Sequence, residues 1–319
     1  MLAVEFDAGR VQINRQRADP IVENGEVLVR VIRAGICETD LQLLRGYMDF
    51  HGVPGHEFVG IAESGRFAGK RVVGEINCPC GKCELCRDGL GNHCPNRTVL
   101  GILNRQGAFA EFVSLPEVNL HAVPDEVTTD EAVFTEPLAA AFQIPVQVPL
   151  KSRDRVTVLG DGRLGNLCAQ VLAMHGCRVR VVGKHPEKLA VIESLGIEAL
   201  LLSKAGREKA SDIVVDCTGS PEGLRTALDF VRPRGTVVFK TTVAGSHELP
   251  LAPVVIDEIT LVGSRCGPFA PALEALRTKR VKVAPLITER YPLQEAAAAF
   301  DQARESRSAL KILLDVGKD

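Results

Sequence analysis

The second half of the chain alternates strand-like and helix-like segments, and this alternation constrains the fold more than any other feature. From about residue 155 the apolar, strand-like runs are 155–159, 178–182, 212–216, 235–239 and 260–262, and the helix-like segments between them are 164–175, 186–195 and 221–231. Strands separated by helices of this length form right-handed crossovers around a parallel sheet. We therefore predict a doubly wound α/β domain here.

The rest of the chain has a different character. Up to about residue 135 it consists of short alternating runs separated by Gly and Pro, as in 26–31, which is typical of a β-rich domain. After residue 268 we expect two helices flanking an extended piece at 284–288, and then a strand at 310–316 that returns to the first domain. Pro145 is expected to kink a helix between the domains. The predicted domains are 1–137 with 269–319, and 138–268.

A glycine motif lies between the first strand and the first helix of the α/β part. The residues are Gly160, Asp161, Gly162, Arg163, Leu164 and Gly165, spaced G-x-G-x-x-G. The three glycines permit a tight turn, close approach of a pyrophosphate, and close packing of helix on strand. The phosphate would lie at the helix N-terminus, where free N–H groups favour negative charge. The alternative is a tight turn without a ligand, which this context makes the weaker interpretation.

The end of the next strand bears on which dinucleotide would bind. NAD sites usually place an acid there, which binds the adenosine ribose, but this chain has Gly183 followed by Lys184 and His185. Loss of the carboxylate and gain of positive charge favour the 2′-phosphate of NADP(H). The alternative is that Lys184 lies in solvent and NAD(H) is accepted.

Four cysteines occur in one short loop, at positions 80, 83, 86 and 94. Two-residue gaps let thiolates converge, and four of them can close a tetrahedral shell around Zn²⁺. We predict that Cys80, Cys83, Cys86 and Cys94 bind a structural zinc; a disulfide pair or a chance cluster is the alternative. A closed site of this kind has no vacant position for chemistry, so activity must reside elsewhere.

Composition excludes several classes of partner. The net charge of the 319 residues is −2, so no overall field recruits nucleic acid or an anionic membrane. No apolar run is long enough to span a bilayer, and the N-terminus lacks the pattern of a signal peptide. Cys168, Cys177 and Cys217 stand in apolar contexts that suit buried free thiols. We expect a cytoplasmic protein with no nucleic-acid or membrane partner.

Several further residues of ligand type are scattered in the first domain. They are Cys37, Thr39 and Asp40, His56 and Glu57, and Glu136, and no local spacing joins them into a site. The order of segments, however, resembles the zinc-dependent medium-chain alcohol dehydrogenase family over essentially the full chain. The matching segments are 35–37, 39–40, 54–58, the four-cysteine loop, 107–111, 136–139, the glycine motif, 286–288 and 311–314.

The resemblance implies a β-rich GroES-like catalytic domain, a Rossmann cofactor domain, and two zinc ions per chain. It implies that Cys37 and His56 bind the catalytic zinc, with Glu136 as the third ligand or the holder of a water. Glu57 lies beside the metal and could exchange with Glu136, Asp40 would hold the ring of His56, and Thr39 would take the alcohol proton. Lys311, Cys217, Thr218 and Gly219 complete the expected cofactor-binding set.

The implied activity is hydride transfer between an alcohol, polyol or sugar and NADP(H) or NAD(H), in a homodimer or homotetramer. Glutamate at 136, where alcohol-specific relatives often carry cysteine, favours the branch that oxidises polyols. Glu38 and Gln42 depart from the family pattern, since Glu38 would repel a phosphate and Gln42 replaces a relay histidine. These departures motivate the alternative of an inactive protein that binds nucleotide and zinc as a structural or redox-sensing partner.

Overall fold

The computed structural model describes residues 1–241 and 251–318, and they form two compact units. Unit 1 comprises Met1–Glu136, Ala272–Arg277 and Ile287–Asp319, and unit 2 comprises Pro137–Pro271 and Thr278–Leu286. The first break falls within a residue of the predicted domain boundary. Residues 269–271 and 278–286, which the sequence assigned to the catalytic domain, belong instead to unit 2.

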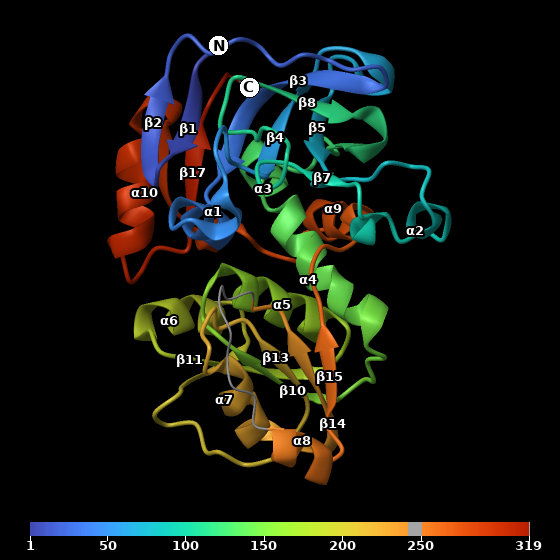
Figure 1. Ribbon diagram of the computed structural model, residues 1–319. Helices are drawn as coiled ribbons and strands as arrows, with labels where there is room; N and C mark the ends of the chain where they lie inside the picture. The colour runs from blue at the N-terminus through green and yellow to red at the C-terminus, as the bar shows by residue number, and fades with distance from the viewer. Residues whose placement is uncertain (242–250, 319) are drawn as a thin grey trace. The chain divides into compact units, whose positions relative to one another are not determined.

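Unit 2 is built on a parallel sheet, as predicted (Figure 1). Its strands, in the described residues, are β10 (Arg155–Leu159), β11 (Arg178–Gly183), β12 (Glu198–Leu201), β13 (Ser211–Asp216), β14 (Val231–Phe239) and β15 (Thr260–Gly263). Their spatial order is β12-β11-β10-β13-β14-β15. Successive strands are thus added on one side of β10 up to β12, and from β13 onward on its other side. Sequence analysis missed β12, and it placed Val231 in a helix although this residue begins β14.

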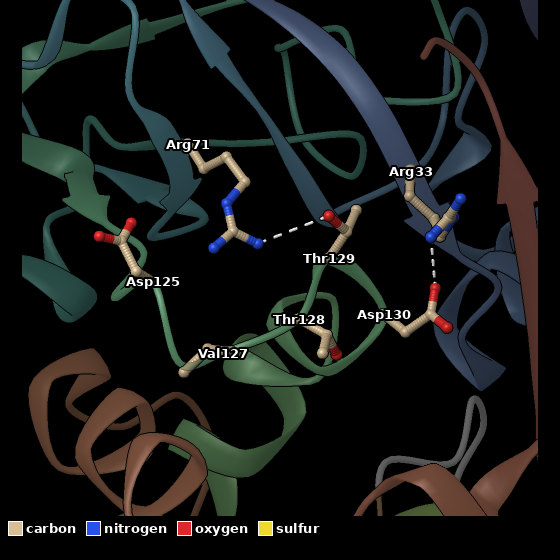
Figure 2. Close-up of a pocket in the computed structure, with 7 residues that line it drawn as sticks. All are labelled: Arg33, Arg71, Asp125, Val127, Thr128, Thr129 and Asp130. Atoms are coloured by element: carbon tan, nitrogen blue, oxygen red, sulfur yellow. Dashed lines mark hydrogen bonds and ion pairs between the residues drawn. The ribbon is translucent and has the colours of Figure 1, made fainter. Parts of the chain in front are cut away.

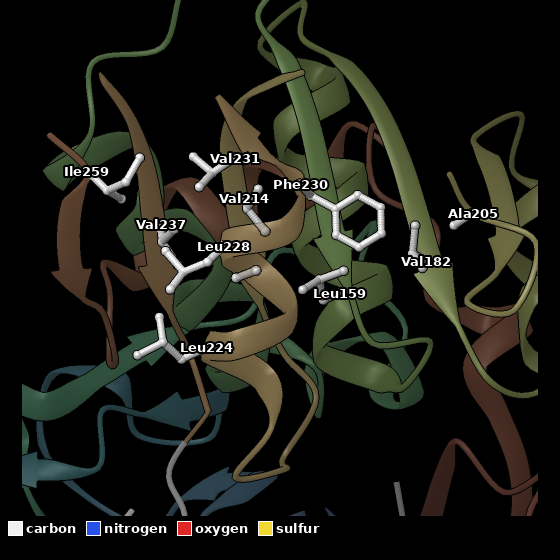
Figure 3. Close-up of a cluster of buried hydrophobic side chains, with 11 residues drawn as sticks. Leu159, Val182, Ala205, Val214, Leu224, Leu228, Phe230, Val231, Val237 and Ile259 are labelled. Carbon is white, nitrogen blue, oxygen red and sulfur yellow. The ribbon is translucent and has the colours of Figure 1, made fainter. Parts of the chain in front are cut away.

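The helices of unit 2 cover this sheet. They are α4 (Thr135–Gln147, which begins at the end of unit 1), α5 (Arg163–Met174), α6 (Pro186–Ser194), α7 (Gly223–Phe230) and α8 (Leu251–Ile256). Pro145, expected to kink the junction, lies inside α4, which continues to Gln147. Strands buried on both faces read as continuous apolar runs, and Leu159, Val214 and Val237 accordingly meet the side chains of α7 in a buried cluster (Figure 3).

Unit 1 is β-rich, as expected. Its strands are β1 (Ala3–Asp7), β2 (Arg10–Asn14), β3 (Glu26–Gly35), β4 (Glu57–Ala62), β5 (Arg71–Gly74), β6 (Asn77–Cys78), β7 (Thr98–Val99), β8 (Phe112–Pro116), β9 (Leu120–Ala122), β16 (Ile287–Pro292) and β17 (Lys311–Asp315). The main sheet has the order β16-β17-β3-β4-β5-β9, with β8 also paired to β3. The predicted return of the terminal strand is confirmed, because β17 pairs antiparallel with β3 at Leu313 and Gly35.

Short helices connect these strands. They are α1 (Glu38–Leu44), α2 (Glu84–Arg87), α3 (Thr129–Ala132), α9 (Phe269–Arg277) and α10 (Ala296–Glu305). The ring of Phe300 on α10 packs edge-on against Phe6 of β1, with centroids 5.2 Å apart. Strand β3 lies in the middle of the sheet and pairs with β17, β4 and β8. The residues that follow it are therefore anchored to a strand that is hydrogen-bonded along both edges. Within the described residues, no helix combines the length and apolarity needed to cross a membrane.

Candidate active site and cofactor site

Three side chains of potential metal ligands converge at the ends of β3 and β4. Cys37 caps helix α1 just after β3, His56 directly precedes β4, and Glu57 is the first residue of β4. Antiparallel pairing places Glu57 opposite Gly35, which brings Cys37 close to Glu57 although the two are twenty positions apart in the chain. One ligand atom from each of Cys37, His56 and Glu57 lies within 4.8 Å of the others. The structure therefore supplies the proximity that sequence spacing could not.

Asp40 anchors two members of this group. Its Oδ2 accepts the backbone N–H of Cys37 at 2.8 Å, and its Oδ1 lies 3.3 Å from Nδ1 of His56. The latter contact is electrostatic rather than an aligned hydrogen bond, since neither atom has a hydrogen-bond partner in the described residues. Asp40 is fully buried and His56 is 3% exposed. A carboxylate at Nδ1 leaves Nε2 as the nitrogen available to a metal.

The electrostatics of this pocket suit a cation. Burial disfavours the charged imidazolium, yet the contacts with Asp40 and Cys37 outweigh burial and raise the pKa of His56 well above its ordinary value. A sulfur, an imidazole and a carboxylate are also a donor set that Zn²⁺ accepts. The residues therefore fit the zinc ion that the sequence implies.

Lys311 lies against this group. Its Nζ forms an ion pair with Oε2 of Glu57 and lies 3.4 Å from the carbonyl oxygen of Ile36. Both charged side chains are buried, with exposed fractions of 0% and 1%. The ammonium also lies 5.5 Å from the ring centroid of Phe134. The residue that the resemblance assigned to cofactor binding thus neutralises Glu57 inside unit 1.

Two other expected site residues lie on different helices. Oγ1 of Thr39 is 3.9 Å from Sγ of Cys37, within the same first turn of α1. Glu136 lies in the first turn of α4 and is not part of the group of converging ligand atoms found among the described residues. Its role as a zinc ligand stays a prediction.

The four loop cysteines form a second group of possible metal ligands. Sγ of Cys83 lies 3.4 Å from that of Cys86 and 3.7 Å from that of Cys94, and all four thiols are free. Backbone N–H groups of Lys82 and Cys83 lower the pKa of Cys80 to about 6, whereas desolvation and the neighbouring sulfurs raise the pKa of Cys86 to about 12. Four sulfurs held this close without disulfide bonds fit a tetrahedral cation site.

The glycine motif forms the turn between β10 and α5. Gly160 has φ +112°, and a Cβ there would lie 2.6 Å from the carbonyl oxygen of Cys217. A Cβ on Gly165 would lie 2.0 Å from the carbonyl oxygen of Gly160, so helix and turn touch directly. Gly162 caps α5, and a Cβ there would meet nothing within 4 Å, which leaves its backbone open to a ligand. Arg163 and Leu164 begin the helix.

The end of β11 holds an unexpected carboxylate. Oδ2 of Asp161 accepts the backbone N–H groups of Lys184 and His185 at 2.6 and 2.7 Å, and Oδ1 lies 3.0 Å from Nδ1 of His185. Sequence analysis placed Asp161 in the turn but missed this contact. Two features of the sequence could have predicted this contact. The glycine motif contains an acid, Asp161, and the next strand ends in a glycine, Gly183, where an acid is usual.

The third strand end contributes Cys217, Thr218 and Gly219, which follow β13. Thr218 donates from its N–H and hydroxyl to Oδ1 of Asp216 at 2.9 and 2.7 Å, which fixes the turn. The thiol of Cys217 lies 3.8 Å from that of Cys168 on α5. A hydrogen bond from Cys217 lowers the pKa of Cys168, and the same contact raises the pKa of Cys217 well above its ordinary value.

A cavity of about 440 Å³ in unit 1 contains none of the predicted site residues (Figure 2). Arg33 lines it and forms ion pairs with Asp130 and Asp315, while Arg71 donates to the carbonyl oxygen of Pro124 at 3.2 Å. Both arginines that line the cavity are therefore engaged by neighbouring oxygen atoms of the protein. We interpret this cavity as a structural ion-pair network rather than a reaction site.

Comparisons with known proteins agree with this geometry. The chain matches family models for the alcohol dehydrogenase GroES-like domain over residues 23–125 and for zinc-binding dehydrogenases over residues 164–278. It is 32% identical to an L-threonine 3-dehydrogenase of Streptomyces avermitilis, over 93% of this chain and 94% of that protein. It is 29% identical to a sorbitol dehydrogenase of Halalkalibacterium halodurans, over 94% of each.

Solved structures are similar throughout. A zinc-binding dehydrogenase structure from Sinorhizobium meliloti 1021, bound to NADP, has a TM-score of 0.89 at 26% identity and covers 99% of both chains. One described as a short chain alcohol dehydrogenase from E. coli CFT073, complexed with NADH, has a TM-score of 0.91 at 26% identity and the same coverage. The two matched domains and the 32% identity along nearly the full length show that the chain belongs to the zinc-binding medium-chain dehydrogenase/reductase family.

Proposed function

We propose that the protein is a zinc-dependent oxidoreductase that transfers a hydride between the CH–OH carbon of an alcohol or polyol and NADP(H). The observation that carries the proposal is the convergence of half-buried Cys37 with buried His56 and Glu57 within 4.8 Å. The family of the chain supports it, because its relatives include proteins named dehydrogenases of sorbitol and of L-threonine.

Each residue of the catalytic group has a distinct task in this proposal. Zinc held by Cys37, His56 and a carboxylate supplies a Lewis acid for the alcohol oxygen, and the nicotinamide supplies the hydride acceptor. Asp40 fixes the ring of His56 and the backbone of Cys37. In this proposal Thr39, whose hydroxyl lies 3.9 Å from the Cys37 sulfur, would take the alcohol proton.

The two glutamates share the remaining ligand position. Glu57 lies within the ligand group but is paired with Lys311, which lowers its capacity to donate to a metal. Glu136, at the start of α4, is the candidate that would leave this pair intact. We assign Glu136 as the third protein ligand and Glu57 as the group that exchanges with it.

A second zinc ion is proposed for Cys80, Cys83, Cys86 and Cys94. All four positions of a tetrahedral ion would be filled by sulfur, so this ion stabilises the loop between β6 and β7 and takes no part in turnover. Its expected effect is on the folding of unit 1.

The metal proposal is tested by zinc content and turnover in matched cysteine variants. We expect about two zinc ions in the wild-type chain, about one in Cys37→Ser and in Cys83→Ser, and about two in the control Cys177→Ser, whose thiol is buried in unit 2. Turnover should vanish in Cys37→Ser alone. Full rates in Cys37→Ser would contradict the catalytic assignment.

The substrate proposed is a secondary alcohol that carries a second polar group on the adjacent carbon. Sorbitol and L-threonine, named for the two relatives, share this feature. A panel of sorbitol, L-threonine, 2,3-butanediol and ethanol, each tested with NADP and NAD, measures it. We expect higher kcat/KM for the substituted alcohols than for ethanol, and for NADP than for NAD; a preference for ethanol would contradict the substrate proposal.

We also propose a cytoplasmic homodimer or homotetramer. None of the ten cysteines forms a disulfide bond, which suits a reducing compartment. Strand β15 lies at the edge of its sheet, and helix α8 before it exposes Val255 and Ile256 to 74% and 78%. Light scattering during gel filtration would measure the mass; a monomer at micromolar concentration would contradict this assembly.

A further inference from the structure

Asp161 occupies the space that a side chain at the end of β11 would fill. A Cβ on Gly183 would lie 2.3 Å from Oδ2 and 2.5 Å from Cβ of Asp161. An acid at position 183, which is the usual ribose ligand of an NAD site, therefore cannot coexist with Asp161 in this position. The carboxylate at the end of β11 is instead that of Asp161, which belongs to the glycine turn.

The hydrogen bonds of this carboxylate show what it does. An ionised carboxylate offers about four acceptor positions, and the protein fills three of them with the N–H groups of Lys184 and His185 and with Nδ1 of His185. The Asp161 side chain is 8% exposed, so it is turned into the protein. Burial alone would raise the pKa of Asp161, but the bonds from His185 and Lys184 outweigh it and lower the pKa. Asp161 is therefore ionised and committed to the backbone turn that follows β11.

The turn that Asp161 holds presents two basic side chains. Because Nδ1 of His185 faces the carboxylate, this nitrogen carries a proton and the ring cannot rotate freely. Its Nε2 has no partner in the part of the chain that the structure describes, and the side chain is 36% exposed. The Lys184 side chain is exposed and forms no ion pair with any described residue. With Nδ1 turned to the carboxylate, Nε2 is the ring nitrogen left to meet a ligand.

We propose that Asp161 is a positioning residue that holds Lys184 and His185 so that both bind the 2′-phosphate of NADP(H). The inference rests on the proposed function, since it assumes that the dinucleotide lies along the glycine turn. His185 donates one charge-assisted hydrogen bond to the phosphate and Lys184 supplies a second. Asp161 itself, with its acceptor positions largely filled, is not the ligand of the ribose hydroxyls. The discrimination between cofactors thus depends on three side chains from two strand ends.

The test uses 2′,5′-ADP and 5′-AMP, which share the adenosine moiety and a 5′-phosphate and differ in the 2′-phosphate. Isothermal titration calorimetry on the full chain gives both affinities without requiring zinc, substrate or turnover. We expect the wild-type protein to bind 2′,5′-ADP at least tenfold more tightly. His185→Gln and Lys184→Gln should each weaken the affinity for 2′,5′-ADP by about tenfold and leave the affinity for 5′-AMP within about twofold of wild type. Lys151→Gln removes the same charge from an exposed lysine before β10, at the opposite end of the sheet, and should change neither.

Asp161→Asn tests the positioning role through the ratio of the two affinities. Asparagine keeps one acceptor oxygen but loses the charge, so the turn loosens and the preference for 2′,5′-ADP should fall by about tenfold or more. A purely structural role would weaken both ligands equally and leave the ratio unchanged, which would overturn the proposal. Equal binding of both ligands by the wild-type protein, or weaker 5′-AMP binding alone in Asp161→Asn, would overturn it as well. Failure of the proposed function looks different: neither fragment, nor NADH or NADPH by fluorescence, would bind at all.

Discussion

At the scale of single residues, contact distances around the site decide which side chains a position accepts. Gly165 and Gly162 belong to the same motif, yet a Cβ would overlap the carbonyl oxygen of Gly160 at the first position and meet nothing at the second. Gly165 is therefore required by the fold of the turn, whereas Gly162 is required only by the ligand that binds there. Stability and cofactor binding should separate at these two positions.

Gly165→Ala should lower the free energy of unfolding by about 1–3 kcal/mol, because its Cβ must displace the backbone of the turn. Gly162→Ala should cost less than about 1 kcal/mol, the usual penalty of alanine at a helix N-cap, while weakening NADPH binding, because its Cβ would project into the ligand space. Urea denaturation and NADPH fluorescence measure the two effects. Equal loss of stability in both variants would contradict the assignment of separate roles.

The buried pair of Lys311 and Glu57 is the second residue-scale feature. Removing one member leaves the other charge buried without a partner, so Lys311→Met should cost about 3–5 kcal/mol of unfolding free energy. The double variant Lys311→Met with Glu57→Gln removes both charges and should recover part of that cost. Unfolding in urea, with zinc content measured in parallel, tests this. A double variant less stable than Lys311→Met would contradict the pairing.

At the scale of elements, the sheet of unit 1 is tied together by polar contacts that respond to pH. Glu26 at the start of β3 accepts hydrogen bonds from Ser114 of β8 at 2.5 Å and from Arg105 at 2.8 Å. Burial would raise the pKa of Glu26, but these two bonds outweigh it and lower the pKa below its ordinary value. A carboxyl with a lowered pKa stabilises the fold above its ordinary pKa, and this stability is lost as the pH falls through the folded-state value.

Glu26→Gln should therefore destabilise the protein by about 1–3 kcal/mol at neutral pH. The difference from wild type should shrink as the pH falls below the ordinary glutamate pKa of about 4.3, because Glu26 then takes up a proton first in the unfolded chain and at lower pH in the folded chain as well. Thermal unfolding followed by circular dichroism across this range checks the sign. A difference that grows toward acid would contradict the lowered pKa.

At the scale of the whole molecule, the two proposed metal sites lie in unit 1 and the glycine turn lies in unit 2. The four-cysteine loop makes few regular contacts, since its strands β6 and β7 contain two residues each. A bound ion is therefore the main source of order that we expect for residues 80–94. Damage to this loop should remain local to unit 1.

Cys83→Ser should increase cleavage by trypsin within residues 80–94, where Lys82 and Arg87 offer sites, and lower the thermal midpoint. NADPH affinity should stay within about twofold of wild type, since no residue of the cofactor turn belongs to unit 1. Cys78→Ala serves as the control, because burial raises the pKa of Cys78 to about 11 and its thiol lies outside the ligand group. Unchanged proteolysis in Cys83→Ser would contradict a structural metal site.

The sequence by itself determined the parallel sheet, the glycine turn and the four-cysteine group, because each depends on periodicity or spacing within a few residues. It also gave the return of the last strand to the first domain. Short or weakly apolar elements such as β12, and the extension of β14 back to Val231, escaped it, since local propensity there is overridden by pairing with β11 and β13.

Only the tertiary structure decided which distant side chains meet. Strand pairing brought Cys37, His56 and Glu57 together, the return of β17 placed Lys311 on Glu57, and the parallel register of β10 and β11 put Asp161 under the turn at His185. The chemistry that each residue type can perform is visible in the sequence alone. Their partners depend on contacts between segments far apart in the chain, and those contacts exist only once the hydrophobic core has fixed the strands side by side.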